Sequence, residues 1–291
     1  MKKEEATAKR EARLKAERAR IESMKVCERE VLALFDPQVP DRPSPQTQAR
    51  TDVLICGIDE AGRGPFAGPV VAGAVILDWD NPEKEILYLN ASKKLSEKKR
   101  EVLFREILSK ALAVGIGSAG ARIIDEINIL QATYLAMRRA ISNLSPVSHL
   151  VSEEEEVHDL VRKLVQYEIT GPSEAYPVLL SPDDGLSAPD SDQNFQACSH
   201  ITPDYILADA VHIPGIRIPQ QGIIKGDARS ISIAAGSIIA KVTRDHIMYE
   251  YDKQHPEYGF ASHKGYGTAR HIAAIREYGL LEIHRRSFIH L

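Results

Sequence analysis

The sequence predicts an α/β protein in which helices cover a sheet and a helical part follows at the C-terminus. Five short apolar runs, rich in small and β-branched residues, have the length of strands, and longer segments with helical periodicity lie between them. The runs occupy about 53–58, 68–77, 111–119, 204–210 and 222–225. Strands and helices that alternate in this way pack as a sheet with helices on its faces.

The composition is that of a soluble globular protein with a sizeable core. The chain has 291 residues, of which 43% are hydrophobic and 27% charged, enough for one large domain or two small ones. No apolar run approaches the ~20 residues of a membrane span, and the charged N-terminus lacks the apolar segment of a signal peptide. The three cysteines are far apart, so we expect a reducing, cytoplasmic setting without disulfides or a membrane.

The net charge of −4 hides an uneven distribution. Residues 151–199 carry eleven acidic and two basic side chains, a net of −9, so the rest of the chain carries +5. Within 145–200, prolines and weak hydrophobic periodicity predict an acidic, disordered loop with one short helix near 153–168. The net charge therefore does not exclude a polyanionic partner such as a nucleic acid.

Residues 1–50 form a charged extension ahead of a domain that we expect over 51–291. Lys, Arg, Glu and Ala over 2–35 predict a helix with a thin apolar stripe, and the prolines between 37 and 45 predict a stiff linker. The helix is either a solvated extension that stabilises nothing or a basic arm that follows a phosphate backbone.

The chain is organised around the loop between its first two predicted strands. Asp59 and Glu60 end the first strand, and the loop that follows contains Gly62, Arg63 and Gly64. Adjacent side chains of a strand point to opposite faces, so both acids serve one site only if the glycines break the pleat. A buried carboxylate is costly unless it is paired or binds a metal. The alternative is an ordinary turn with solvated acids.

A second cluster of charge lies before a helix expected over about 97–110. Lys93 and Lys94 precede it, and three more basic residues lie in its first turn, where the helix dipole disfavours positive charge. We therefore expect an anion nearby, although a solvated turn is an equal alternative. A further helix, over 122–144, has an apolar face that we assign to the core.

Two more acids follow the later strands. Asp209 lies near the end of the strand at 204–210, and Asp227 precedes a helix over 228–245 whose Ala, Gly and Ser residues allow close packing on a sheet. Asp227 is either a site residue or the N-cap of that helix. Asp245 lies in the middle of the helix beside Arg244 and is interpreted as a structural salt-bridge acid.

The C-terminal part, 255–291, contains a turn with Tyr266 between two glycines, followed by a helix over 269–279 that Thr268 can cap. A tyrosine held out in this way can stack on a sugar or base, and the alternative is a packed turn residue. The histidines lack metal-ligand spacing, so we assign none of them to a metal.

Several strings of the sequence resemble the motifs of type 2 ribonuclease H, or ribonuclease HII. The longest runs from Gly57 to Val71, and others are the segments Ser92–Leu95, Asn128–Thr133, Lys225–Ser237 and 263–271, followed by 284–288. The family normally has Asp where Ala91 stands, so the role of that acid is open here. The family usually passes directly into its next strand where the segment 145–200 stands here, so we interpret this segment as an insertion. The resemblance implies a ribonuclease H-like mixed sheet of five strands.

The resemblance further implies that Asp59, Glu60, Asp209 and Asp227 are the catalytic, metal-binding acids. Four converging carboxylates with no basic partner in the core motifs repel one another unless divalent cations bind, and oxygen ligands suit Mn²⁺ or Mg²⁺. Two ions ~4 Å apart can activate a water and stabilise the leaving oxygen of a phosphodiester.

The implied substrates are RNA/DNA hybrids and duplex DNA with embedded ribonucleotides, cut 5′ of the ribonucleotide to give 5′-phosphate and 3′-hydroxyl ends. The backbone of Gly62, Arg63 and Gly64, with Tyr266, is implied to read the 2′-hydroxyl at the RNA–DNA junction. Four basic residues are weaker candidates for phosphate contacts: Lys93, Lys94, Lys225 and Arg286. We expect a monomer. A ribonuclease HIII-like hybrid nuclease and a non-catalytic nucleic-acid binding protein stay open as alternatives.

Overall fold

The computed structural model describes residues 2–35, 53–147, 156–165 and 201–290. Within these ranges it has one five-stranded sheet in the order β3-β2-β1-β4-β5. The first three strands are antiparallel neighbours, whereas β4 and β5 run parallel to β1, so the sheet is mixed as expected. The strands are β1 Ile55–Ala61, β2 Val70–Leu77, β3 Ala111–Ala119, β4 Tyr205–Asp209 and β5 Gln220–Ile223.

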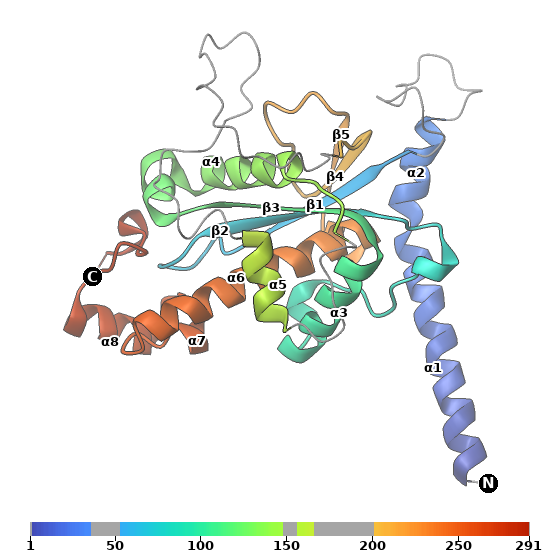
Figure 1. Cartoon of the computed structure of the whole chain (residues 1–291), viewed down its shortest axis with the longest axis horizontal. Coiled ribbons are helices and arrows are strands. Elements are labelled where there is room, and N and C mark those ends of the chain that lie inside the picture. The colour runs from blue at the N-terminus through green and yellow to red at the C-terminus, as the bar shows by residue number, and fades with distance from the viewer. Residues whose placement is uncertain (1, 36–52, 148–155, 166–200, 291) are drawn as a thin grey trace.

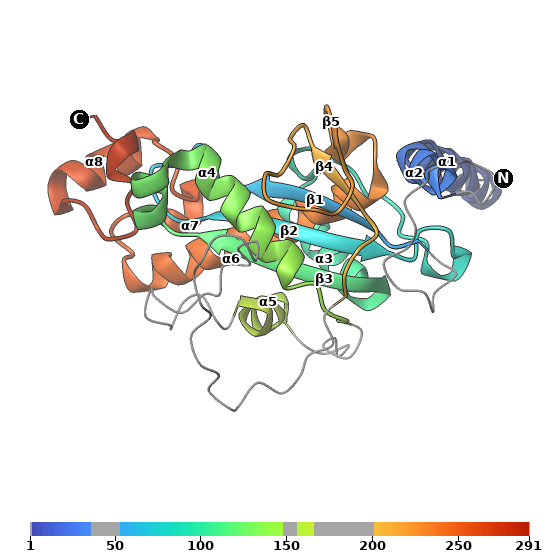
Figure 2. The same ribbon diagram turned by 90° about the horizontal axis from the view of Figure 1, so that it is seen from above.

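Helices cover both faces of the sheet (Figures 1 and 2). Helix α6 (Ile231–Gln254) crosses one face and α4 (Ala121–Ser142) the other, with α3 (Glu97–Lys110) beside α6. Side chains of β1 alternate accordingly: Ile55 packs on the α6 side, and Cys56 and Ile58 join the core under α4. The same alternation puts Asp59 on the α6 side.

Helix α6 lies unusually close to the sheet because small residues face each other. A Cβ on Gly57 of β1 would lie 2.0 Å from the carbonyl carbon of Ser232, and a Cβ on Gly236 of α6 would lie 2.7 Å from the Gly73 carbonyl oxygen. The expectation that the Ala, Gly and Ser residues of this helix permit close packing agrees with these distances.

The boundaries of α6 differ from those predicted. The helix begins at Ile231 and not at 228, because Ser230 is its N-cap and accepts the Ile233 N–H at 3.1 Å. Asp227 lies instead in the short 3-10 turn η3 (Gly226–Ala228), so the N-cap interpretation of Asp227 was wrong. Strand β5 is likewise shifted from 222–225 to 220–223, since Lys225 adopts a left-handed conformation that ends the extended run.

The apolar pattern predicts one continuous helix over 122–144, but α4 is interrupted at Asn128. Asn128 has φ 67° and ψ 164°, and its side-chain oxygen accepts the N–H groups of Leu130 and Gln131. The side chain thus caps a second helical segment inside the predicted one, which is the usual way in which asparagine competes with helical hydrogen bonds.

The N-terminal extension forms two helices, α1 (Lys2–Met24) and α2 (Val26–Leu34), and α1 projects away from the sheet in Figure 1. The end of α1 and the inner face of α2 are buried in the core, through Ile21, Met24, Cys27, Val31 and Phe35. Neither sequence-based interpretation, a solvated helix or a basic arm, describes this second half, because its apolar stripe is packed on the domain.

The short helix expected within the insertion is α5 (Val157–Val165), whose Val157, Leu160 and Val161 are buried against the core. The expected disorder of the rest of 145–200 falls largely on 148–155 and 166–200, outside the described residues. The C-terminal part contains α7 (Phe260–His263) and α8 (Ala269–Tyr278), the latter capped by Thr268 as predicted. Among the described residues, no helix is both long and apolar enough to cross a bilayer.

The contact between β1 and α6 yields the first prediction. Gly57→Ala should lower the free energy of unfolding by about 1–3 kcal/mol, because the added methyl group meets backbone atoms that cannot move aside. Gly120→Ala is the matched control: its Cβ would have no atom within 4 Å, and we expect a change within about 0.5 kcal/mol. Chemical denaturation of the three proteins measures both values, and equal stabilities would contradict the described packing.

Candidate active site

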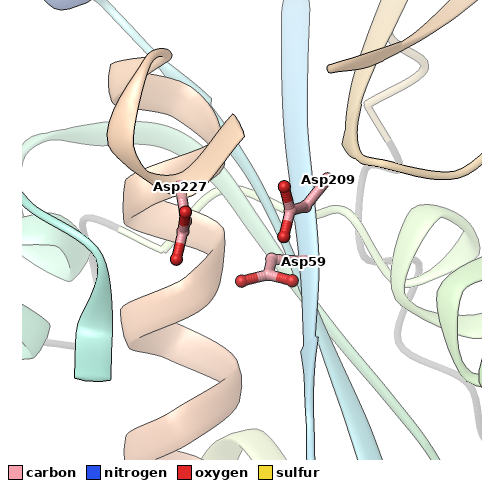
Figure 3. A group of neighbouring side chains, drawn as sticks. All are labelled: Asp59, Asp209 and Asp227. Atoms are coloured by element: carbon pink, nitrogen blue, oxygen red, sulfur yellow. The ribbon is translucent and has the colours of Figure 1, made fainter. Parts of the chain in front are cut away.

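Three aspartates meet where β1, β4 and the turn η3 come together (Figure 3). One carboxylate oxygen from each of Asp59, Asp209 and Asp227 lies within 4.8 Å of the others. Parallel pairing of β1 with β4 brings the first two side by side, although they are 150 positions apart in the sequence. Asp59 is buried and the other two are partly buried, so the cluster is open on one side.

Burial is the main influence on Asp59. It raises the pKa of the carboxyl well above its ordinary value, and the charges of Glu60 and Asp209 raise it further. A hydrogen bond from the Ser237 hydroxyl opposes this shift. Ser237 lies on α6 and is itself 2.9 Å from the Ser92 hydroxyl, which follows Ala91. The segment in which Ala91 replaces the usual Asp is therefore linked to Asp59 by hydrogen bonds through the hydroxyl groups of Ser92 and Ser237.

Asp209 has a raised pKa for the same reason, burial first and the charge of Asp227 second. Its Oδ1 accepts the Gly226 N–H at 2.6 Å, and the positive charge of Lys93 lowers its pKa. Among the basic residues predicted to contact phosphates, Lys93 thus lies close enough to lower the pKa of Asp209. This agrees with the expectation of an anion near Lys93.

Glu60 lies outside the group formed by the three aspartates. Strand β1 continues regularly through Asp59 and Glu60 to Ala61, so the pleat does not break between the two acids; the turn comes at Gly62, which has φ 92°. Glu60 pairs with Arg63, with 3.3 Å between Oε1 and Nη1. The expectation that the core motifs hold no basic partner for the acids was wrong, although the Arg63 side chain is 45% exposed and the pairing is weak. Burial raises the pKa of the Glu60 carboxyl, Arg63 opposes this shift, and the charge of Asp209 adds to it.

The donor set fits a hard divalent cation. Burial raises the pKa values of the Asp59 and Asp209 carboxyls, and the charge of Asp227 adds to the rise at Asp209. An ion that neutralises these charges would stabilise the cluster. Oxygen-only ligands in a partly open site favour Mg²⁺ or Mn²⁺ over softer metals. Asp59, Asp209 and Asp227 are the residues placed to hold such an ion.

The glycine-rich loop is held from beneath by two buried arginines that sequence reasoning missed. Arg285 donates to the carbonyl oxygens of Gly62, Arg63 and Gly68 at 2.6–2.9 Å. Arg244 donates to those of Ala67, Pro69 and Lys264 at 3.0–3.1 Å. Burial lowers the pKa of Arg285 to about 9 and that of Arg244 to about 10.

This arrangement fixes the carbonyl side of the loop. The later amides of the loop, those of Phe66, Ala67 and Gly68, donate to the carbonyl oxygens of Gly265 and Ile283. Among the described residues, the N–H groups of Gly62, Arg63 and Gly64 have no hydrogen-bond acceptor. Gly64 and Arg63 are exposed. The loop therefore presents backbone donors outward from a rigid base.

Tyr266 lies beside this loop. Its ring carbon Cε1 is 3.7 Å from where a Cβ of Gly64 would be, and the residue is 48% exposed. It is thus neither the packed turn residue of the alternative interpretation nor remote from the glycines.

Buried histidines fix the backbone of Tyr266. The Leu281 N–H donates to His284 Nδ1, the Nε2 atoms of His284 and His271 are 3.1 Å apart, and His271 Nδ1 lies 3.0 Å from the Tyr266 carbonyl oxygen. Only one pair of tautomers satisfies this series of hydrogen bonds: His284 Nε2–H donates to His271 Nε2, and His271 Nδ1–H donates to the Tyr266 carbonyl oxygen. Both rings are therefore neutral, and burial lowers both pKa values to about 4.

The remaining predicted residues are less closely tied to the cluster. Lys94, Lys225 and Arg286 are exposed, and the Arg286 backbone N–H donates to Asp125. Asp245 is a structural acid as expected, but its partners are Lys241 at 2.6 Å and Arg100 at 3.5 Å. Its neighbour Arg244 supports the loop instead.

A mixed five-stranded sheet with helices on both faces, and with acids gathered where β1, β4 and the turn η3 meet, has the architecture of the ribonuclease H-like fold. The family model of ribonuclease HII matches residues 56–169 and 195–291. Ribonuclease HII of Lachnoclostridium phytofermentans is 50% identical over 235 residues, which cover 81% of this chain and 70% of that protein. The chain belongs to the ribonuclease HII family, a family of endoribonucleases, and membership implies ribonuclease H activity.

Solved structures agree on the fold. The ribonuclease H2 of Pyrococcus horikoshii OT3 superposes with a TM-score of 0.52 at 21% identity, covering 81% of this chain and 93% of that one. The Mn²⁺ complex of Bst-RNase HIII gives 0.50 at 14% identity, covering 86% and 75%. At these identities the likeness extends to the fold alone.

The loop support yields the second prediction. Arg285→Lys should lower the free energy of unfolding by about 2–4 kcal/mol, because a lysine cannot reach all three carbonyl oxygens and leaves buried acceptors unpaired. Arg286→Lys, at the adjacent exposed position, is the control and should change it by less than about 0.5 kcal/mol. Urea denaturation distinguishes them, and a reversed order would contradict the assignment of Arg285.

The acid cluster yields the third prediction. In chelator at pH 8, Asp209→Asn should stabilise the protein by about 1 kcal/mol, because the raised pKa of Asp209 means that its ionised form destabilises the folded state. The folded protein binds more protons than the unfolded chain, so the gain should shrink as the pH falls toward the ordinary carboxyl pKa.

Asp125→Asn is the control for that measurement. The Asp125 carboxyl accepts hydrogen bonds from Arg286 and Ser287 that lower its pKa despite burial, so its loss should destabilise the protein. Melting temperatures over pH 5–8 test both. A loss of stability in Asp209→Asn at pH 8 would show that the three acids do not repel one another in the folded state.

Proposed function

We propose that this protein hydrolyses the RNA strand of RNA/DNA hybrids and cuts duplex DNA on the 5′ side of embedded ribonucleotides. The observation that supports this most directly is that the loop with free amides, against which the exposed Tyr266 ring lies, directly follows the strand that carries Asp59. The family supplies the class of reaction, and this juxtaposition supplies a place to recognise the sugar next to the scissile phosphate.

Asp59, Asp209 and Asp227, with Glu60, are proposed to hold the divalent ions. Bound Mg²⁺ or Mn²⁺ would supply an activated water and neutralise charge on the leaving oxygen in an in-line displacement. The residues of the chain supply the rest: Ser237 and the Gly226 amide orient the Asp59 and Asp209 carboxylates, and Lys93 offsets part of the negative charge.

Recognition of RNA is assigned to the loop and to Tyr266. The free N–H groups of Gly62, Arg63 and Gly64 can donate to the ribose 2′-hydroxyl, a group that DNA lacks. The Tyr266 ring is proposed to lie against the next sugar, where a deoxyribose fits and a 2′-hydroxyl is crowded. Lys94, Lys225 and Arg286 are exposed and are proposed to contact phosphates.

The protein is proposed to act as a monomer in the cytoplasm. The cysteines Cys27 and Cys56, buried and free, are consistent with a reducing compartment.

A cleavage assay tests the function and yields the fourth prediction. The substrates are a DNA duplex with one ribonucleotide and a long RNA/DNA hybrid, each assayed with Mn²⁺, Mg²⁺ or chelator. Wild type should cut both with either metal, and Asp209→Asn should lose at least about 100-fold in rate while it still binds duplex. Metal-independent cleavage, or none on either substrate, would overturn the proposal.

Tyr266→Ala tests the junction assignment in the same assay. It should reduce cleavage at the single ribonucleotide at least about tenfold more than cleavage within the hybrid, since only the former requires the sugar contact. Tyr266→Phe, which keeps the ring, is the control and should retain the wild-type ratio of the two rates. An unchanged ratio in Tyr266→Ala would remove this residue from junction recognition.

A further inference from the structure

A buried carboxylate of the N-terminal extension lies against the start of α6. Glu28 of α2 is 0% exposed. Its Oε1 accepts the Ser230 hydroxyl at 2.6 Å and the Ser232 N–H at 3.1 Å. With Ser230, which accepts the Ile233 N–H, it satisfies two of the amides that the first turn of a helix leaves free. Its negative charge also suits the positive end of the helix dipole.

The hydrogen bonds continue from Ser230 into the acid cluster. The Ser230 N–H donates to the Gly226 carbonyl oxygen at 2.8 Å, and the Gly226 N–H donates to Asp209 Oδ1 at 2.6 Å. Asp227 lies within the same turn, between Gly226 and Ser230. An unbroken path therefore connects Glu28 with Asp209 and with the backbone that carries Asp227.

The extension is anchored firmly enough to act at this point. Next to Glu28, Cys27 and Val31 are buried together with residues of β1, β4, β5 and α6, and the Cys27 thiol approaches the Arg229 carbonyl oxygen at 3.8 Å. Movement of Glu28 thus requires α2 to leave the domain.

Stability alone does not account for a carboxylate at this place. Burial raises the pKa of Glu28, and its second oxygen, Oε2, has no hydrogen-bond partner among the described residues. A buried polar atom without a partner costs free energy that an apolar side chain would not. The hydrogen bonds of Oε1 are the feature that an apolar replacement would lose.

We propose that Glu28 is a positioning residue for the metal site: the N-terminal extension holds the turn 226–230 from behind and thereby sets the separation of Asp209 and Asp227. This rests on the proposed binding of divalent ions by the three aspartates. It gives the extension a role in the chemistry, although α2 contributes no side chain to the cluster itself.

Calorimetric titration of the full-length protein with Mn²⁺, in the absence of substrate, tests this inference and yields the fifth prediction. Glu28→Ala should weaken Mn²⁺ binding about tenfold, the size of effect seen when groups that orient metal ligands are removed. Glu28→Gln keeps the Oε1 acceptor and should weaken it less. Ser230→Ala breaks the same path from the other side and should resemble Glu28→Ala.

Glu30→Gln is the matched control, since Glu30 is an exposed acid on the same helix and its loss changes the charge equally. It should bind Mn²⁺ as wild type does. In cleavage assays, Glu28→Ala should need about tenfold more Mn²⁺ for half-maximal rate and reach a maximal rate within about twofold of wild type. A merely structural role would lower the melting temperature and leave the metal dependence unchanged.

The outcomes separate the two proposals. Equal Mn²⁺ affinity in wild type, Glu28→Ala and Ser230→Ala overturns the positioning role and leaves the proposed function intact. A wild-type protein that binds no Mn²⁺ overturns the proposed function and this inference with it. Equal weakening in Glu28→Ala and Glu30→Gln would assign the effect to general electrostatics and also overturn the inference.

Discussion

Repulsion among three partly or fully buried carboxylates is the constraint on which the rest of the structure depends. Asp59, Asp209 and Asp227 converge from two parallel strands and a turn, and burial makes the charges of Asp59 and Asp209 costly. In the absence of an ion, such a cluster is held together by a rigid frame, and the frame here is the close contact of α6 with the sheet. Small residues on both sides allow that contact. Ser237 of α6 and Gly226 of the turn before it donate hydrogen bonds to the acids.

A second frame, made of two positively charged side chains, supports the glycine-rich loop. Arg244 and Arg285 are both buried, and each lies on carbonyl oxygens of the loop region. Burial lowers the pKa of Arg285, and the positive charge of Arg244 lowers it further. The loop carbonyls bear the partial negative charge that offsets both, so loop conformation and arginine burial are mutually dependent.

Much of this arrangement could be predicted from the sequence, because strands and strand ends leave strong patterns. The run 111–119 is β3, and acids at the ends of the runs near 59 and 209 meet as parallel pairing requires. Contacts between distant side chains left weaker patterns. Nothing in the sequence around the adjacent Arg285 and Arg286 indicates which of them is buried. The sequence-based prediction names Arg286, the exposed one, as a phosphate contact and does not identify Arg285 as the support of the loop. Glu28 did leave a pattern: Met24, Glu28, Val31 and Phe35 follow helical spacing, so an acid interrupts the apolar stripe.

The parallel pairing of β1 with β4 has a consequence for how the protein is made. During synthesis, β1, β2 and β3 can form an antiparallel meander as soon as they emerge, whereas β4 pairs with β1 across about 140 intervening residues. Contacts of such long sequence separation form late. The growing chain therefore carries Asp59 at an unpaired sheet edge until β4 arrives, and its cation site cannot exist before residue 227 has left the ribosome. The number of residues between β1 and β4 has little effect on the free energy of their pairing, because the cost of closing a loop grows only with the logarithm of its length.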